Sequence, residues 1–450
     1  MSKIIGIGTA NPGYSMSQTE SAQLAMEVFD LDDRQKRVLN VLYKKAGVQN
    51  RHTVLPHRIA MNWVGEEDSS GDVLTATTLG PTTRERMDFF NANAPALAVE
   101  AARNAFANAA EVWLDPNSSQ APSTRTHKVE HSEPANREFG SDETVPTVVT
   151  SNQPSLSEFN EESGEGRSPS DGEGHSSRSQ NSAHPNTQTD QASPQVTAQD
   201  ITHLVTVSCT GFGAPGFDIE LIEQLGLSHN TQRVHVGFMG CHGAVNGMRV
   251  AQSLADSQPN ANVLLVATEC CSLHYRFQYD PDLIMGNALF GDGAAALLIQ
   301  GSDEDGATGP TVAATGCCLI PDSKDAMSWT VGDHGFEMFI SSQVPGLIES
   351  HLRPWLESWL AEQDLTLGDI GGWAIHPGGP RILQAAQDAL ELTNDDLAVS
   401  RSVLADLGNM SSPTILFIMQ RMLQQRGSEA LPIVMIGFGP GLMAEAALLR

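Results

Sequence analysis

The chain has 450 residues, of which 40% are hydrophobic and 18% charged, enough apolar material for a large folded core. Its formal net charge of −28, from 54 acidic and 26 basic residues, argues against binding to nucleic acid, which requires a basic surface. Six cysteines, four of them in adjacent pairs, fit neither a disulfide framework nor a zinc site. Residues 1–8 lack the features of a secretory signal and no apolar run is long enough to cross a membrane, so we expect a cytoplasmic protein without metal or membrane binding.

The first hundred residues predict a strand and two long helices. Residues 3–8 predict the strand, and apolar spacing predicts helices from Ser17 to about Lys45 and from Thr83 to Trp113. The first helical pattern ends in a basic cluster, which is either a solvated surface or a docking point for a phosphate-bearing ligand. The cluster comprises Arg37, Lys44, Lys45 and Arg51.

Residues 115–200 differ in composition from the rest of the chain. Ser, Asn, Gln, Pro, Thr, Glu and Gly dominate, aromatic residues nearly vanish, and no periodicity is visible. Such a segment buries too little apolar surface to offset the entropy of ordering. We therefore predict a disordered acidic insertion within an N-terminal half, which leaves about 365 residues for the folded body.

From residue 201 onward, strands alternate with helices. In the first group, strands are predicted at 201–208, in the apolar run that ends before Gly237, at 262–268 and within 286–299. Helices are predicted at 219–225 and from Ala244 onward. The second comprises helices at 344–360, 381–390 and 413–426, with strands at 372–376 and 431–442. This alternation predicts an α/β fold with buried sheets. We expect two halves of similar topology, residues 1–300 and 301–450, because the turns at 239–243 and 407–411 have equivalent places and could face one another.

Cys241 lies at a predicted strand-to-helix turn, where unpaired backbone N–H groups favour a thiolate. A free cysteine that fills a small core site is the alternative. His376 ends an apolar strand before Pro and Gly residues and is a candidate partner, although it could instead only cap that strand. Asn409 either caps a helix or donates an amide N–H to an oxyanion. His242 adjoins Cys241 but should point another way, and so support the site from beside it.

A cysteine, a histidine and an asparagine on three loops can form an activated nucleophile with charge-stabilising donors. Taken alone, the trio fits acyl transfer through a thioester and a thiol peptidase equally well.

Five motifs occur in an order that resembles the type III polyketide synthases, the chalcone and stilbene synthase family of thiolase fold. They are the Gly-Cys-His-Gly-Ala turn around Cys241, residues 288–294, 376–380, 408–412 and 437–442. The resemblance covers nearly everything outside the insertion. It implies a thiolase-like αβαβα layered fold and a homodimer.

The resemblance also implies a reaction. An acyl group from an acyl-CoA starter would load onto Cys241, while His376 and Asn409 would promote decarboxylation of malonyl-CoA. Repeated condensation and cyclisation would follow, giving a pyrone, resorcinol or chalcone-like product. Coenzyme A thioesters are then substrates, and no cofactor is expected.

Further positions match the family's cavity and coenzyme A contacts. Phe290 matches an aromatic gate, Ser411 a cavity-lining serine, and Met338 stands in for a second gate phenylalanine, with Phe339 alongside. Three positions, Lys45, Arg381 and Gly379, fall where the family contacts coenzyme A.

Three departures from the plant pattern lead us to expect a reshaped cavity for an aliphatic starter. His274 replaces a cavity threonine, Trp329 a small glycine, and Ala214 a methionine that extends across the dimer interface.

Two other hypotheses stay open at this point. One is a 3-ketoacyl synthase of the same fold that makes a single condensation. The other is a non-catalytic interaction protein whose acidic insertion recruits a partner. Chain-length analysis of the products separates the first from a polyketide synthase, and deletion of residues 120–195 tests the second.

Overall fold

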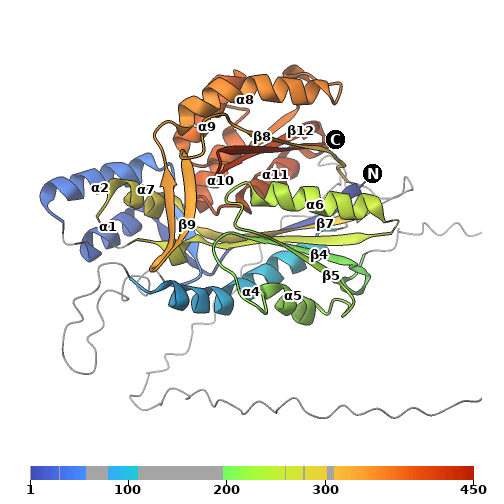
Figure 1. Cartoon of the computed structure of the whole chain (residues 1–450), viewed down its shortest axis with the longest axis horizontal. Coiled ribbons are helices and arrows are strands. Elements are labelled where there is room, and N and C mark those ends of the chain that lie inside the picture. The colour runs from blue at the N-terminus through green and yellow to red at the C-terminus, as the bar shows by residue number, and fades with distance from the viewer. Residues whose placement is uncertain are drawn as a thin grey trace, which may run out of the picture. The chain divides into compact units, whose positions relative to one another are not determined.

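The computed structural model describes residues 2–29, 31–56, 80–109, 196–258, 260–276, 279–301 and 309–450 (Figure 1). Of the insertion predicted at 115–200, residues 115–195 lie outside the described residues. Its last residues are ordered, because Val196 packs against the core and a short 3₁₀ helix, η1, spans Ala198–Asp200. The folded chain therefore resumes a few residues earlier than the composition predicts.

The larger sheet has five strands in the order β1-β7-β6-β4-β5. Its strands are β1 (Ser2–Ala10), β4 (His203–Ser208), β5 (Gln232–Gly237), β6 (Asn262–Cys270) and β7 (Asp292–Gly301). β4 runs parallel to β5 and β6, whereas β7 pairs antiparallel with β6 and β1. The central strands are buried on both faces, but β5 is an edge strand whose first four residues are exposed.

The smaller sheet has four strands in the order β11-β12-β13-β8. They are β8 (Val312–Leu319), β11 (Gly372–Ile375), β12 (Ile433–Gly439) and β13 (Met443–Leu449). β11 is parallel to β12, and β13 is antiparallel to both of its neighbours. This pattern repeats that of β4, β6, β7 and β1 in the larger sheet.

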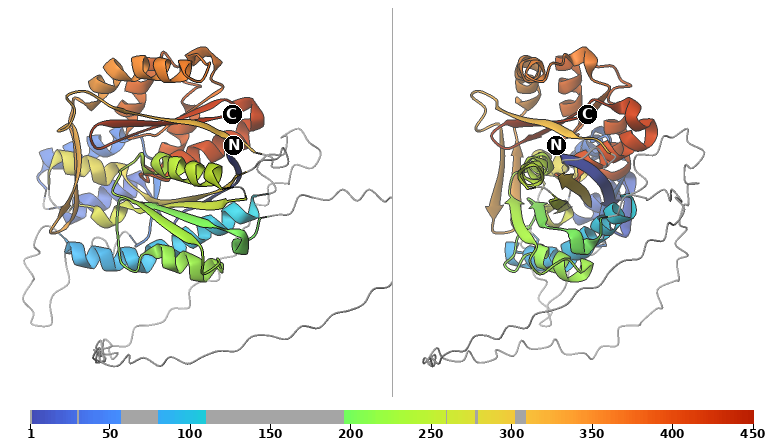
Figure 2. Two further views of the ribbon diagram at one scale, coloured as in Figure 1. Left: turned by 45° about the vertical axis from the view of Figure 1, so that its right-hand side comes forward. Right: turned by 90° about the vertical axis from the view of Figure 1, so that its right-hand side faces the viewer.

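Helices fill three layers around the two sheets (Figure 2). Between the sheets lie α6 (Gly243–Ser257) and α11 (Thr414–Arg426), whose side chains form one core with the inner faces of both sheets. Outside the larger sheet lie α4 (Thr83–Ala107) and α5 (Phe217–Leu225), and outside the smaller sheet lie α8 (Val344–Ala361) and α9 (Pro380–Leu390). The five layers confirm the predicted αβαβα architecture of two topologically similar halves.

Glycines allow the layers to approach closely. A Cβ at Gly8 of β1 would lie 2.1 Å from the backbone nitrogen of Ala105 in α4, so the helix can touch the strand only at a glycine. Gly6 has the same role, because a Cβ there would lie 2.5 Å from Ala105 O.

Smaller elements surround this body. The helices are α1 (Gln18–Val28), α2 (Asp33–Lys45), α7 (Pro281–Leu289) and α10 (Ala398–Leu407), and a satellite core joins them. Two-stranded sheets pair β2 (Tyr14–Ser17) with β3 (Asn50–Thr53), and β9 (Met327–Gly332) with β10 (Gly335–Ile340). Short 3₁₀ helices are η2 (Cys271–His274), η3 (Leu367–Asp369) and η4 (Gly427–Ala430).

The helix predicted from Thr83 to Trp113 ends at Ala107, and three further predictions differ from the structure. The single helix from Ser17 to Lys45 is wrong, because Asp32 accepts hydrogen bonds from the N–H groups of Arg34 and Gln35 and starts a second helix there. The glycine-rich bend before β7 contains α7, and the closing strand is followed by β13, which the sequence did not predict.

Candidate active site

Cys241 lies in the turn between β5 and α6, as predicted. The backbone has positive φ at Phe238 (60°) and Gly240 (78°), and a Cβ at Gly240 would lie 2.6 Å from Pro440 Cδ. Only glycine fits at position 240, and it lets the turn press against residue 440 of the C-terminal half. The Cys241 side chain keeps partial exposure, toward a cavity that it lines.

The turn before α11 faces the Cys241 turn. The side chains of Ser411 and Asn409 lie close enough to the Cys241 thiol to lower its pKa, and Ser411 lines the same cavity as Cys241. Asn409 is not a helix cap, because α11 begins after Pro413. Its Oδ1 instead accepts a 2.8 Å hydrogen bond from the Ser411 N–H, so its amide N–H groups are left for the thiol side. The predicted meeting of the two turns is confirmed.

His376 directly follows β11, and its backbone N–H donates to Ile436 O at 2.8 Å. The next residue of β12, Gly437, lies against His242: a Cβ there would be 3.0 Å from the His242 Cβ and 3.8 Å from Cys241 O. The strand register therefore brings His376 to the Cys241 turn. Its ring is buried, and neither ring nitrogen has a hydrogen-bond partner among the residues that the structure describes.

Burial sets the charge state of the trio. It raises the pKa of Cys241 to about 11, which outweighs the hydrogen bonds from Ser411 and Asn409. It lowers the pKa of His376 to about 3, and nearby His242 lowers it further. Both shifts favour the neutral forms in the free site, a thiol at Cys241 and an uncharged imidazole at His376. Desolvation thus opposes the thiolate that a helix terminus favours, and the thiolate stays a prediction.

The cavity beyond Cys241 contains every side chain predicted to contact substrate. Phe290, Met338, Ser411 and His274 line it, and so does Trp329. Trp329 Nε1 donates to Cys209 O at 2.7 Å, and its ring meets those of His274 and Phe336 edge to face. Phe339, next to Met338, is 49% exposed and does not line the cavity. Water-sized molecules have about 70 Å³ in which to move, because these large rings fill the space.

The ring of His274 lines the cavity, but the backbone occupies both of its nitrogens. Nδ1 accepts from the Phe336 N–H at 3.0 Å, and Nε2 lies 2.7 Å from Thr210 O. Burial lowers the pKa of His274 to about 3, so the ring is neutral and holds β10 to the loop after β4. Its contact with a substrate can only be through the ring face.

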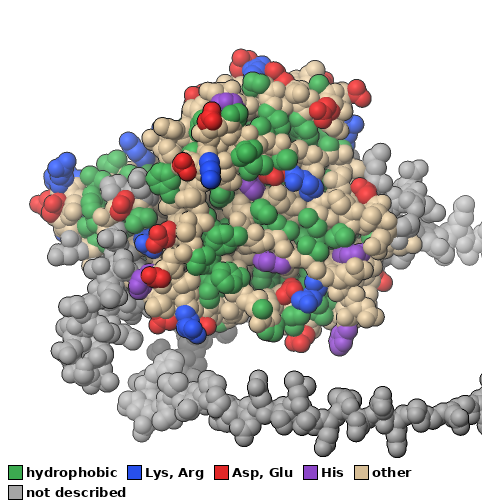
Figure 3. Space-filling model, viewed as in Figure 1, with side chains coloured by type: hydrophobic (Ala, Val, Ile, Leu, Met, Phe, Trp, Pro, Cys, Tyr) green, Lys and Arg blue, Asp and Glu red, His purple; other side chains and the backbone are tan. Residues whose placement is uncertain are grey.

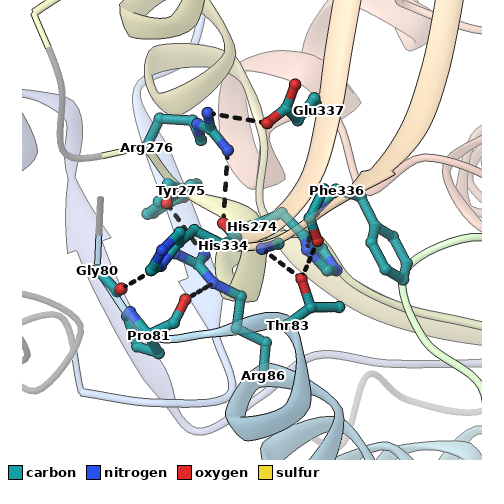
Figure 4. A network of polar contacts seen from close by, with 12 residues as sticks. Gly80, Pro81, Thr83, Arg86, His274, Tyr275, Arg276, His334, Phe336 and Glu337 are labelled. Atoms are coloured by element: carbon teal, nitrogen blue, oxygen red, sulfur yellow. Dashed lines mark hydrogen bonds and ion pairs between the residues drawn. The ribbon is translucent and has the colours of Figure 1, made fainter. Parts of the chain in front are cut away.

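Two arginines support the cavity wall behind His274 (Figure 4). Arg86 is fully buried and donates to Pro81 O at 2.9 Å and to Tyr275 O at 3.1 Å. Arg276 lines the cavity and pairs with Glu337 of β10 at 3.1 Å. The β9–β10 hairpin is thus tied to the segment after η2, which explains how Met338 keeps its place.

The predicted coenzyme A contacts gather at one rim. Lys45 and Arg381 are exposed. A Cβ at Gly47 would lie 2.8 Å from Pro380 Cγ, and one at Gly379 would lie 3.8 Å from Leu289 Cδ2. The ends of α2, α7 and the start of α9 therefore converge beside Phe290.

Arg51 does not belong to that basic rim. It is fully buried and donates to Ala288 O at 2.7 Å and Phe290 O at 3.2 Å. The interpretation of Arg51 as part of a solvated or phosphate-binding cluster is wrong. It holds the end of α7, and with it Phe290, by satisfying carbonyls that a helix terminus leaves free.

Sequence reasoning missed three residues behind the nucleophile. Cys209 and Cys271 line the same cavity as Cys241, and Cys209 Sγ lies 3.2 Å from Ser411 Oγ. Glu269 is buried and accepts from Thr210 Oγ1 at 2.6 Å and Ser412 Oγ at 2.5 Å. Cys209 comes just after β4, and Glu269 and Cys271 lie at the end of β6. These positions at strand ends were the sequence signal that could have marked them as site residues.

Among the described residues, no group of three or more His, Cys, Asp and Glu side chains is placed to hold a metal ion. A search of the same residues finds no helix that combines the length and the apolar character of a membrane span.

Comparisons with known proteins agree with this site. Residues 192–304 match the family described as chalcone and stilbene synthases, N-terminal domain, and residues 312–450 match its C-terminal domain. The 1,3,6,8-tetrahydroxynaphthalene synthase of Streptomyces peucetius is 37% identical over 260 residues, which are 57% of this chain and 68% of the relative. Type III polyketide synthase C of Arabidopsis thaliana is 37% identical over 264 residues, 56% of this chain and 68% of the relative.

Two further relatives extend the comparison. The alpha-pyrone synthesis polyketide synthase-like protein Pks18 of Mycobacterium tuberculosis is 36% identical over 256 residues, 56% of this chain and 65% of the relative. The crystal structure of PKS-I from the brown alga Ectocarpus siliculosus superimposes with a TM-score of 0.74 at 23% identity. That comparison covers 100% of this chain and 98% of the other, and it supports the fold alone.

The thiolase-like layers and the two matched domains define an acyltransferase. The chain belongs to the chalcone and stilbene synthase family, the type III polyketide synthases.

Proposed function

We propose that this enzyme loads an acyl group from an acyl-CoA starter onto Cys241 and extends it by decarboxylative condensation of malonyl-CoA. The observation that carries the proposal is the pair of facing turns, which place Asn409 and Ser411 close enough to the Cys241 thiol to lower its pKa at the edge of the cavity. A thiol held between donors, beside a neutral imidazole, suits transfer of an acyl group.

In the loading step, the Cys241 thiol gives its proton to His376 as the sulfur attacks the thioester carbonyl. Coenzyme A leaves as a thiolate and takes a proton from water, and His376 remains as an imidazolium. Since burial disfavours the separate charges in the free site, the pair forms only as the substrate enters and reacts.

In the extension step, malonyl-CoA loses carbon dioxide and an enolate develops on the thioester oxygen. Asn409 and the His376 imidazolium would donate to that oxygen, and such preorganised donors are each worth on the order of 10²-fold in rate. The carbanion then attacks the acyl carbon on Cys241, a carbon–carbon bond forms, and the Cys241 thiolate leaves. The Asn409 amide is already oriented for this donation by the Ser411 N–H.

Coenzyme A thioesters would enter past the basic rim. Lys45 and Arg381 are exposed there, and Gly379 leaves space beside Leu289 and Phe290. Cations on this rim can hold the phosphates of coenzyme A while the acyl chain passes Phe290. We propose no other cofactor.

The filled cavity favours a short acyl chain. Trp329, His274 and Phe336 occupy space at its wall, so we propose an aliphatic starter, few extensions, and a pyrone or resorcinol in preference to a chalcone-like product. The names of the relatives include both an alpha-pyrone and a tetrahydroxynaphthalene enzyme. A single condensation is the second candidate, favoured by the same lack of space.

We also propose a cytoplasmic homodimer. Phe212, Phe238 and Met239 are 53%, 39% and 44% exposed, and the two phenylalanines pack on the same Phe336 ring. Hydrophobic side chains gather across the face that Figure 3 shows. Exposed apolar patches of this kind commonly become interfaces. Light scattering of wild-type protein and of a Phe212→Glu variant tests this, and a monomeric wild type would contradict it.

Purified full-length protein with isotope-labelled malonyl-CoA and a panel of acyl-CoA starters tests the reaction. We expect labelled products whose mass gives the number of extensions, and an acylated Cys241 peptide. A lack of both with every starter would contradict the proposal, and a single added unit would select the single-condensation alternative.

A further inference from the structure

The imidazole of His242 occupies a niche made by glycines of β12. A Cβ at Gly439 would lie 2.4 Å from His242 Cδ2 and 2.6 Å from Nε2, and one at Gly437 would lie 3.0 Å from the His242 Cβ. No other side chain fits at either position without displacing the ring. The C-terminal Gly-x-Gly, which does not bind a nucleotide, therefore makes room for this histidine.

Hydrogen bonds connect His242 to a charged pair. Its Nδ1 lies 2.6 Å from Asn246 Oδ1, and Asn246 Nδ2 donates to Glu445 Oε1 at 2.9 Å. The other carboxylate oxygen of Glu445 pairs with Arg249. Glu445 is buried, whereas Arg249 is partly exposed. The chain thus runs from the surface to the residue beside the nucleophile.

This chain determines which way each group points. Because the Glu445 carboxylate in its ion pair can only accept, Asn246 must turn its NH₂ group toward it and its carbonyl toward His242. His242 Nδ1 must then carry the proton. Burial lowers the pKa of His242, so the ring is neutral and Nε2 is an unprotonated acceptor.

That acceptor lies near His376. His242 Nε2 and both ring nitrogens of His376 are buried, and none has a hydrogen-bond partner among the residues that the structure describes. Strand β12 brings the two residues together, because Ile436 O accepts the His376 N–H at 2.8 Å and a Cβ at the next residue, Gly437, would lie 3.0 Å from the His242 Cβ. His242 Nε2 is a buried acceptor without a donor, and the His376 ring gains a second N–H during the reaction. That N–H would satisfy the acceptor.

We propose that His242 is a positioning residue for His376. Once His376 takes the Cys241 proton, one of its N–H groups faces the thioester oxygen, and the other donates to His242 Nε2, directly or through one water molecule. Glu445 and Asn246 act through His242 by holding it in the tautomer that accepts. This inference rests on the proposed function, because it assigns a role within the same reaction.

The test compares His242→Leu with His242→Gln in the full chain. Glutamine can place an amide oxygen near the position of Nε2, whereas leucine has a similar bulk and no acceptor. We expect His242→Leu to lower kcat for malonyl-CoA decarboxylation by about 10- to 100-fold with KM changed by less than about threefold, because orientation is lost and binding is kept. His242→Gln should lose clearly less.

His203 offers a matched control. It is buried, and its Nε2 also lacks a partner among the described residues, but it begins β4, about 16 Å along the strand from Ser208. His203→Leu should keep the wild-type kcat. If His242→Leu also keeps kcat, or if the leucine and glutamine variants of His242 lose it equally, the inference is overturned.

Asn246→Leu provides a second test if His242→Leu does not fold. It leaves the imidazole in place but removes the carbonyl that holds Nδ1–H, and we expect kcat to fall about 3- to 10-fold. An unchanged kcat would overturn the inference. If wild-type protein neither decarboxylates malonyl-CoA nor acylates Cys241, the proposed function itself fails. If the wild type and His242→Leu are equally active, only the role of His242 fails.

Discussion

Residues 238–243 and 408–413 have equivalent places in the two halves, since each turn leads into a helix between the sheets, α6 or α11. The first turn leaves Phe238 and Met239 partly exposed and Cys241 open to the cavity. All six residues of the second turn are buried. The first turn therefore presents Phe238, Met239 and Cys241 outward while His242 is buried, and the second turn holds all of its side chains inside.

The equivalent strands β4 and β11 end in a similar contrast. Cys209 follows β4 and lines the cavity although it is buried, whereas His376 follows β11, is buried and does not line the cavity. A nucleophile must reach entering substrates, while donors to a developing charge work best when they are already in place. The repeated fold thus supplies an accessible half and a preorganised half, and the following changes test that division.

Cys241→Ala should have the largest effect. Without the sulfur no acyl-enzyme forms, and we expect product formation to fall by at least about 10³-fold. Some decarboxylation of malonyl-CoA should persist, since Asn409 remains and a neutral His376 still carries one N–H. Product mass spectrometry measures both reactions. Cys270 is buried and does not line the cavity, so the control variant Cys270→Ala should keep activity. Product formed by Cys241→Ala would show that another thiol carries the growing acyl chain.

Asn409→Asp tests the buried half. The new carboxylate still accepts the Ser411 N–H, so the turn should keep its conformation, but the amide donor is lost. We expect kcat for decarboxylation to fall by about 10²-fold or more. The buried carboxylate should lower the unfolding midpoint, because it loses its hydration, so a cooperative unfolding transition measured beside the kinetics checks that the variant is folded. Retained decarboxylation in a folded variant would remove Asn409 from the oxyanion site.

The pH dependence of Cys241 alkylation tests its charge state in the free enzyme. Burial raises the pKa of this thiol to about 11, so the thiolate fraction should rise about tenfold per pH unit between pH 7 and 10. The rate of iodoacetamide labelling at Cys241, with the Cys241→Ala variant as background, follows that fraction. A rate that is already constant near pH 7 would instead show a preformed thiolate–imidazolium pair.

Trp329→Ala should have the smallest effect on rate but a visible one on products. Removal of the indole enlarges the cavity, and we expect the ratio of longer to shorter products, or the preference for bulky starters, to change about tenfold. The free energy of unfolding should fall by about 2 kcal/mol or more. Trp355→Ala on α8 should lower stability without changing the products; an unchanged product profile for Trp329→Ala would argue that Trp329 does not limit chain length.

Local patterns in the sequence were sufficient for much of this enzyme. Alternating strands and helices predicted the layers. Glycine-bearing turns, after strands for Cys241 and His376 and before a helix for Asn409, predicted the three candidates. These features depend on neighbours within a few residues, so a single chain displays them. The roles of the three residues stay predictions until the variants are measured.

Tertiary structure decided what no local pattern contains. The buried position of Arg51, the backbone contacts of both His274 nitrogens, the exposed edge at β5 and the extra strand β13 all depend on residues far apart in the chain. The charge state of Cys241 is the clearest case. Its helix position predicted a thiolate, but desolvation by the whole surrounding fold determines the pKa, and desolvation is a sum over neighbours that only the folded chain brings together.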